Sequence, residues 1–224
     1  ETQSRLLKNL ALLSKIIKNK NSNYAKIVNG YYNADHQLVP IKKAPSSSKI
    51  PDGKIVRPIK LIFNNGYYYL IAAQYSTTKG ECFVVHYRVD RLYQIEQYKL
   101  PAKDHTKYAI EEPPMDAAEY RLHHPVMFGD DMQEIRMQVT NNPYMLNVLT
   151  DVFGTAADIR VLDEKWLRVT VTASVDGTRL VATEYCNDIH VLSPKSLAKQ
   201  IKQNISKALE WYDHIDETED ETED

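Results

Sequence analysis

The sequence lacks the motifs that most often mark an enzyme or a metal site. It contains no Gly-x-Ser-x-Gly nucleophile motif, no glycine-rich phosphate loop and no pair of carboxylates in an apolar setting. Its histidines do not follow a zinc-ligand spacing, and the only two cysteines, Cys82 and Cys186, are far apart. We therefore expect no metal, no cofactor and no catalytic activity.

Long apolar segments are also missing. No apolar run approaches the roughly 18 residues that a membrane-spanning helix requires, and the first residues do not resemble a signal peptide. Each cysteine lies in an apolar, strand-like run, which favours buried, reduced thiols. These features predict a cytoplasmic protein with no membrane partner. Because the chain begins with Glu1 rather than Met, we expect it to be part of a longer protein.

What the sequence does contain is an ordinary globular composition with an uneven distribution of charge. Its 224 residues, 43% hydrophobic and 26% charged, are enough for one large domain or two small ones. The net charge is +4 over residues 1–23, +5 over residues 24–98 and −11 from Lys99 onward. Positive charge therefore gathers in the first half, where it can attract an anion. The alternative is a chance imbalance on a solvated surface.

Residues 1–23 contain an amphipathic pattern, and we expect them to form an N-terminal linker helix. Between Ser4 and Lys18, apolar residues recur at the spacing of one helical face. Such a helix either bridges to an upstream domain or packs on the domain that follows, and the pattern leaves both alternatives open.

Residues 24–98 change to short, alternating, β-type segments that are separated by turn residues. The expected strands are Ala25–Tyr32, Leu38–Lys43, Lys54–Phe63, Tyr67–Gln74, Cys82–Val89 and Leu92–Tyr98. Asn64–Gly66 favours a type I′ hairpin turn, and Pro58 predicts a bend or a sheet edge because proline cannot donate a ladder hydrogen bond. Several short strands in about 75 residues predict a small β-barrel, since closure leaves no exposed edge.

The second half of the chain predicts a separate α/β domain over residues 115–212, after an irregular linker over residues 99–114. Asp116 is expected to cap one helix, and the Ser193 hydroxyl another. The expected order β-α-β-β-α-β-α comprises Gln133–Val139, Pro143–Phe153, Ala157–Leu162, Leu167–Ser174, Leu180–Tyr185, His190–Leu192 and Pro194–Tyr212. This order predicts a ferredoxin-like sandwich and an α+β fold class for the chain. Residues 213–224 form an acidic tail that we expect to be disordered.

Two neighbouring strand-like segments combine aromatic rings with basic side chains. Alternation along Cys82–Val89 places His86 and Arg88 on one face and sends Phe83, Val85, Tyr87 and Val89 into the core. Asp90 follows, and we expect it to hold Arg91 in a bidentate pair.

These residues suggest a site for a planar anion, because fixed guanidinium groups beside tyrosine rings suit a nucleotide or a short single strand. The candidate ligand-binding residues are Arg57, Lys60, Tyr69, His86, Arg88 and Arg91. The alternative is plain architecture, in which the tyrosines stabilise strands and the Asp90–Arg91 pair pins a turn.

An ordered series of short motifs resembles the WYL domain family and its C-terminal extension. The matching segments are Val56–Leu61, Tyr68–Leu70, Tyr87–Leu92, Asp116–Phe128, Asp151–Gly154 and Val191–Pro194. Tyr68 stands in place of the tryptophan for which the family is named, and Lys54 stands near where family members often carry arginine. The resemblance implies a Sm-like or SH3-like β-barrel over residues 24–98, followed by a small α/β domain that is often involved in dimerisation.

The resemblance also implies regulation of transcription in response to a nucleotide or a single-stranded nucleic acid. The expected function is therefore the ligand-sensing and dimerisation region of a bacterial transcriptional regulator. Contact with duplex DNA is expected only through an N-terminal helix-turn-helix domain that these residues do not contain. A nucleic-acid-binding accessory module and a protein-interaction scaffold remain as alternatives. We expect a homodimer that uses Ser4–Lys18, Pro194–Tyr212 or the C-terminal sheet.

Overall fold

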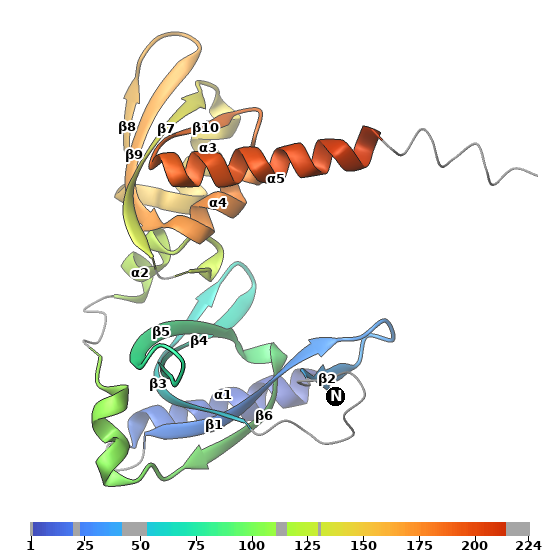
Figure 1. Ribbon diagram of the computed structural model, residues 1–224, viewed down its shortest axis with the longest axis vertical. Helices are drawn as coiled ribbons and strands as arrows, with labels where there is room; N and C mark the ends of the chain where they lie inside the picture. Colours follow the sequence, from blue (N-terminus) through green and yellow to red (C-terminus); the bar gives the residue numbers. More distant parts are fainter. Residues whose placement is uncertain (1, 20–22, 42–52, 111–115, 130, 214–224) are drawn as a thin grey trace, which may run out of the picture. The chain divides into compact units, whose positions relative to one another are not determined.

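The computed structural model describes residues 2–19, 23–41, 53–110, 116–129 and 131–213 (Figure 1). The chain divides into two compact units, unit 1 over Glu1–Pro114 and unit 2 over Met115–Asp224. Each unit contains its own antiparallel sheet with helices, so the predicted α+β fold class is confirmed. No helix in the described part of the chain is long and apolar enough to cross a membrane. The predicted acidic tail lies outside the described residues, except for Asp213.

Unit 1 begins with helix α1, Thr2–Lys18, which confirms the predicted amphipathic helix. Its apolar stripe faces the unit's own sheet, where Leu13 and Ile16 are fully buried. Asn9 adds a polar tie, because its side-chain amide donates to the carbonyl oxygen of Leu92 at 3.1 Å. The pattern left two alternatives open, and the helix takes the second: it packs on the domain that follows it.

The sheet of unit 1 is a strongly curled half-barrel of antiparallel strands (Figure 1). Its strands are β1 (Tyr24–Tyr32), β2 (Leu38–Pro40), β3 (Lys54–Asn64), β4 (Tyr67–Ser76), β5 (Glu81–Arg88) and β6 (Leu92–Tyr98). They pair in the order β2-β1-β3-β4-β5, and β6 pairs with the other side of β1. Among the described residues β5 and β6 do not pair, so the sheet is open there and differs from the closed barrel that we expected.

Turn and bend residues explain the local course of β3 and β4. Asn65 and Gly66 have φ angles of 47° and 81°, as the predicted type I′ hairpin turn requires. The pairing of β3 with β4 shifts register between Pro58 and Lys60, which confirms the predicted bend. On its other side β3 pairs with β1 only over Lys54–Val56, so the missing donor of Pro58 breaks no bond with β1.

The apolar core that includes α1 lies between this helix and one face of the sheet. Leu70, Ala72, Tyr87 and Val89 are buried there with the helix residues, and each fully buried large side chain contributes roughly 1.5–3 kcal/mol. The predicted alternation of β5 is thus confirmed for its last residues. It is wrong for Phe83, which is 37% exposed because the apolar cluster reaches only as far as Val85 along this strand.

The expectation of an irregular linker over residues 99–114 is wrong for seven of these residues. Residues Ala102–Tyr108 form a 3-10 helix, η2. Tyr108 is buried beside Tyr24 and Leu100 in a second, small apolar cluster of unit 1. Leu100 lies just before this polar segment and Tyr108 ends it. The segment is ordered, contrary to the expectation, because these two residues anchor it to the sheet.

Unit 2 contains a four-stranded antiparallel sheet with the order β10-β7-β9-β8. The elements are α2 (Ala117–His123), η3 (Pro125–Met127), β7 (Met132–Thr140), α3 (Pro143–Phe153), η4 (Gly154–Ala156), β8 (Asp158–Val161), β9 (Trp166–Ser174), α4 (Val175–Glu184), β10 (Ile189–Ser193) and α5 (Lys195–Asp213). In this sheet the first strand neighbours the third and the fourth, which is the arrangement of the predicted ferredoxin-like sandwich.

Helix ends in unit 2 follow their sequence signals in part. As predicted, the Asp116 carboxylate accepts a hydrogen bond from the backbone of α2. Gly154 ends α3 with a φ of 49°. Helix α4 begins at Val175 rather than at Leu180, because buried Val175, Thr178 and Val181 continue its apolar face. The predicted Ser193 cap is wrong, since Ser193 is the last residue of β10.

The helices of unit 2 cover one face of its sheet and leave the other face open (Figure 1). The covered face carries the alternate apolar residues of β7 and β9, such as Met137 and Val169. Leu197 and Ile201 bring the first turns of α5 into the same core. The open face therefore carries the polar residues of the central strands.

Candidate ligand-binding site

The register of β3, β4 and β5 decides which of the predicted site residues share a face. Directly opposed residues on neighbouring antiparallel strands project from the same face, with Cβ atoms about 4.5–5.5 Å apart. Three rows run across the strands: Ile62–Tyr69–Arg88, Lys60–Ile71–His86 and Arg57–Ala73–Val84. Every predicted site residue except Arg91 thus projects from the face opposite to the α1-packed core.

The register shift at Pro58 explains how Arg57 and Lys60 come to this face together. Residues three apart in a regular strand point to opposite faces. Here Arg57 pairs with Ala73 and Lys60 pairs with Ile71, so β3 contains one extra residue between them. The bulge therefore returns Lys60 to the face that Arg57 already occupies.

Arg88 lies at the centre of the site and is held by Asp90. Its Nε and Nη2 atoms donate to the two carboxylate oxygens of Asp90 at 3.1 and 2.8 Å. Burial opposes the charge of Arg88, but hydrogen bonding and attraction from Asp90 outweigh it, so the pKa of Arg88 is raised. The expected Asp90–Arg91 pair is wrong, because the 3-10 turn Val89–Arg91 directs Asp90 back to the end of β5.

Two tyrosine rings complete the surroundings of Arg88. The Cζ atom of Arg88 lies 3.4 Å from the centroid of the Tyr67 ring, a close cation–π contact. Burial raises the pKa of the Tyr69 phenol, with Arg88 and Arg91 opposing the shift, so the phenol stays protonated at neutral pH. We did not predict Tyr67 as a site residue, although alternation placed it on the face of Tyr69.

Arg91 is exposed at the end of the turn and acts on Tyr69 through its charge. Within the described ranges no carboxylate lies at ion-pair distance from Arg91. We call Tyr67, Tyr69, Arg88, Asp90 and Arg91 the tyrosine–arginine cluster. It combines one oriented guanidinium, one exposed guanidinium and two phenol rings.

The remaining predicted residues lie farther along the strands. His86 and Lys60 flank Ile71, one row from Arg88. Arg57 lies about 13 Å along β4 from the Arg88 row, taking roughly 3.4 Å per residue. Its Nε atom donates to the carbonyl oxygen of Tyr108 at 3.1 Å, which ties β3 to η2. A role for Arg57 in ligand binding therefore stays a prediction.

The opposite face at the hairpin end carries a second aromatic pair. The rings of Phe63 and Tyr68 lie 5.0 Å apart, and both are exposed. Tyr68 therefore lies outside the tyrosine–arginine cluster. In the described ranges no three histidine, cysteine or acidic side chains are grouped to hold a metal ion.

Comparisons with known proteins establish the fold alone. No family model matches the sequence. No curated protein matches it either. A solved structure described as a CRISPR Cas-related protein is 13% identical, with a TM-score of 0.53 over 93% of this chain and 53% of that chain.

A second similar structure is proteasome accessory factor B/C of Arthrobacter aurescens. It is 17% identical over 93% of this chain and 27% of that chain, with a TM-score of 0.34. This chain thus spans about half of the length of one of these proteins and about a quarter of the other.

Proposed function

We propose that the tyrosine–arginine cluster binds a nucleotide or a short single-stranded nucleic acid. The observation that carries the proposal is the fixed stack of Arg88 on Tyr67, with the phenol of Tyr69 opposite Arg88 in the strand register. A guanidinium held in place loses little freedom when it binds a phosphate, and an aromatic ring supplies a face for a base. The proposed activity is binding and not catalysis.

The regulatory role is the second part of the proposal. The motifs Tyr68–Leu70 and Tyr87–Leu92 resemble those of the WYL family, and the shared fold with the Cas-related structure is compatible with that resemblance. We propose that this chain is the ligand-sensing region of a bacterial transcriptional regulator, and that ligand binding at the cluster changes the activity of that regulator. Duplex DNA would then be bound by a separate helix-turn-helix domain.

A titration of the purified chain tests the binding proposal. Labelled oligo(dT), oligo(rU) and cyclic nucleotides are titrated by fluorescence anisotropy against the unaltered chain and the Arg88→Ala variant. Arg88→Ala should weaken binding by about 1.5–3 kcal/mol, the range of a charge-assisted hydrogen bond. Arg179→Ala is the matched control, because Arg179 also contacts an aspartate but lies on α4 of unit 2. Equal affinity of the Arg88 variant for every ligand would contradict the site.

We also propose that the protein is a homodimer that pairs through α5. The apolar stripe of this helix begins with buried Leu197 and Ile201 and continues through exposed Ile205, Leu209 and Tyr212. An apolar hollow of about 250 Å³ lies beside the same helix and includes Ile201 and Ile205 in its lining. A second copy related by a two-fold axis would bury this stripe against itself.

Light scattering at about 100 µM tests the dimer, since this concentration exceeds micromolar dissociation constants. The unaltered chain should have the mass of two copies, and Leu209→Glu should have the mass of one. Lys207→Glu is the control on the same helix and should remain a dimer. A monomer mass for the unaltered chain would rule out the proposed pairing.

A further inference from the structure

The open face of the unit 2 sheet gathers basic side chains in an acidic part of the chain. The sequence from Lys99 onward carries a net charge of −11. Alternation along β7 and β9 nevertheless places Arg136 and Arg168 together on the open face, since each lies between residues of the buried core. The two arginines are therefore brought close together on one face of the sheet.

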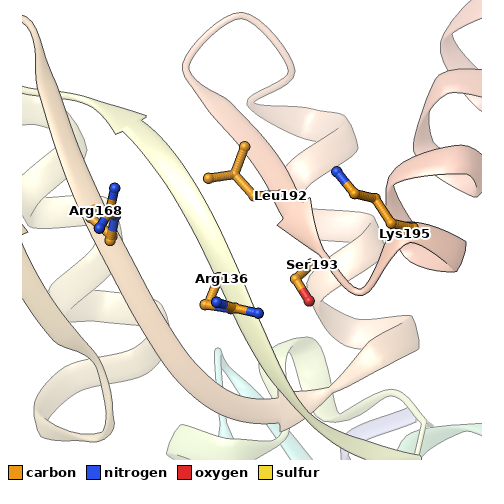
Figure 2. A pocket seen from close by; sticks show the side chains of 5 residues that line it. All are labelled: Arg136, Arg168, Leu192, Ser193 and Lys195. Atoms are coloured by element: carbon orange, nitrogen blue, oxygen red, sulfur yellow. The ribbon is translucent and has the colours of Figure 1, made fainter.

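These arginines line a pocket of about 510 Å³ (Figure 2). The lining, called here the unit 2 pocket, consists of Arg136, Arg168, Leu192, Ser193 and Lys195. Figure 2 shows that these side chains come from β7, β9, the end of β10 and the start of α5. A register shift in the pairing of β10 with β7 leaves Leu192 as an extra residue and places Ser193 opposite Arg136. The volume lies in the range of small-ligand and cofactor sites.

The positive charge of the pocket is weakly compensated. The nearest ion-pair partner of Arg136 is Glu134 at 3.9 Å, and both side chains are exposed. In the part of the chain that the structure describes, Arg168 and Lys195 have no carboxylate within ion-pair distance. The neighbouring Arg160 differs, because Asp158 binds it at 2.8 Å. Three clustered cations without a carboxylate in the lining favour an anionic occupant.

One aromatic ring accompanies the cations on the open face. Trp166 precedes Arg168 by two residues, so the two side chains project from the same side of β9 about 7 Å apart along the strand. Its ring lies 5.4 Å from that of His190 on β10. The other open-face residues of β7 and β9 are not aromatic, so Trp166 is the stacking platform that these two strands offer beside the cations. One base and one phosphate group match this arrangement.

We propose that the unit 2 pocket binds the phosphate of a nucleotide, free or within a single strand, and that Trp166 stacks on the adjoining base. Arg136, Arg168 and Lys195 bind the phosphate oxygens, and Ser193 donates from its hydroxyl group. This site shares no residue with the tyrosine–arginine cluster, so it does not depend on the function proposed for unit 1.

Tryptophan fluorescence provides a direct test, because Trp166 and Trp211 are the only tryptophans of the chain. The variant Trp211→Phe leaves Trp166 as the sole reporter, and Trp211 is largely exposed on α5. This variant is titrated with adenosine monophosphate, short oligo(dT) and pyrophosphate while Trp166 is excited at the red edge of its absorption. A saturable change in Trp166 emission is the expected result.

Substitutions of the cations separate this site from the one in unit 1. In the Trp211→Phe background, Arg168→Gln and Arg136→Gln should each weaken binding about 10- to 100-fold. Arg88→Ala and Arg179→Gln should leave the Trp166 signal unchanged. Because Arg136 and Arg168 are exposed, both variants should keep the far-ultraviolet circular dichroism of the parent.

The ligands distinguish the possible sources of the phosphate. Saturation by adenosine monophosphate indicates a free nucleotide, whereas saturation by oligo(dT) alone indicates a strand. Pyrophosphate lacks a base and should bind more weakly than either. Pyrophosphate affinity equal to that of the nucleotide contradicts the role of Trp166. Absence of saturation with all three ligands, or equal weakening by Arg179→Gln, overturns the proposal.

Discussion

In the tyrosine–arginine cluster of unit 1, Arg88 already has a carboxylate and an aromatic ring as partners. In the unit 2 pocket, Arg168 and Lys195 have no carboxylate partner among the described residues. Both sites lie on antiparallel sheets and bring basic groups from neighbouring elements together. They differ in how the positive charge is stabilised before any ligand binds.

This difference has opposite consequences for orientation and for charge. Asp90 and Tyr67 fix the guanidinium of Arg88, so little side-chain entropy is lost on binding, but Asp90 cancels its charge. In the unit 2 pocket, Arg168 and Lys195 have no carboxylate partner among the described residues and attract an anion from farther away. They must then lose rotamer freedom when the anion arrives. The first arrangement favours recognition of shape, and the second favours attraction of charge.

Removing Asp90, the carboxylate partner of Arg88, should have the largest effect of the changes considered, because the unit 2 pocket contains no comparable buried pair among the described residues. The Arg88 and Asp90 side chains are only 21% and 16% exposed, so Asp90→Ala leaves a largely buried cation without its partner. We expect unit 1 to lose about 1–3 kcal/mol of its free energy of unfolding. Urea unfolding followed by circular dichroism measures the loss.

The matched control is Asp158→Ala, which removes the same kind of partner from Arg160. Those side chains are 73% and 54% exposed, and exposed pairs contribute at most about 1 kcal/mol. Tryptophan fluorescence follows this variant, since both tryptophans lie in unit 2. Equal losses in the two variants would contradict the difference in burial on which the comparison depends.

The pH dependence of unit 1 should show the next largest effect. Burial raises the pKa of Tyr87, whose hydroxyl group donates to the Gln74 amide oxygen. The unfolded chain ionises this tyrosine near pH 10, whereas the folded chain does not. Its contribution is therefore complete below about pH 10 and is lost above it, by about 1.4 kcal/mol per pH unit.

Comparison of variants isolates this contribution from those of other tyrosines. Between about pH 10 and 11.5, the free energy of unfolding of Tyr87→Phe should fall less steeply than that of the unaltered chain. The difference in slope should be about 1.4 kcal/mol per pH unit, which corresponds to one proton. Tyr31→Phe is the control, because Tyr31 is exposed on β1. Identical slopes for the unaltered chain and Tyr87→Phe would contradict the burial of this phenol in unit 1.

Local patterns in the sequence predict most of the secondary structure and the topology of unit 2. The type I′ turn at Asn65–Gly66 depends only on residues within the turn, so the Asn-Gly dipeptide is enough to predict it. The order of strands and helices after Asp116 predicts the ferredoxin-like sheet, because few ways exist to pack that order. The turn is determined by interactions close in sequence, whereas the strand order follows from the limited number of ways in which these elements pack.

The partner of Asp90 and the packing of η2 depend on geometry that alternation does not encode. A carboxylate between Arg88 and Arg91 can reach either residue, and the 3-10 turn selects Arg88. Leu100 and Tyr108 anchor a segment whose other residues are polar. The closed barrel was predicted from the number of short strands and from the family resemblance, and neither carries information about whether β5 pairs with β6 in this chain.

The sequence analysis did not predict the unit 2 pocket, although the sequence shows that its two arginines lie on polar strand faces. Apolar residues alternate regularly in β7 and β9, so Arg136 and Arg168 could have been assigned to the polar face. Their proximity could not be assigned, because it requires that β7 and β9 be neighbours. The shift that places Ser193 opposite Arg136 is a property of the folded pairing.

The aromatic partner of Arg88 provides a smaller test of the comparison. Tyr67→Leu removes the ring beneath the guanidinium and should weaken ligand binding to unit 1 by about 1 kcal/mol, roughly fivefold. Tyr68→Leu is the matched control, since Tyr68 contacts the ring of Phe63 on the opposite face. Fluorescence anisotropy with oligo(dT) measures both. Equal weakening of binding by the two variants would show that the contact of the Tyr67 ring with Arg88 makes no specific contribution.

The smallest expected effect is a difference in salt dependence between the two surfaces. Binding of a single strand weakens with salt by a log–log slope of roughly −0.7 for each phosphate that is neutralised. Asp90 cancels the charge of Arg88 and leaves Arg91 as the main cation of the cluster, whereas Arg136, Arg168 and Lys195 all remain charged in the pocket. We therefore expect a slope of about −0.7 for unit 2, whose proposed ligand places one phosphate among these cations, and a shallower slope for unit 1.

Each slope can be measured on the full chain by silencing the other site. Oligo(dT) binding to Arg168→Gln reports unit 1, and binding to Arg88→Ala reports unit 2, at sodium chloride concentrations that span one decade. A steeper slope in the Arg88 variant follows directly from Arg168 and Lys195, which have no carboxylate partner in the described part of the chain. Equal slopes would mean that Asp90 does not neutralise Arg88 toward a ligand, because the ligand then displaces the carboxylate and binds the freed guanidinium itself.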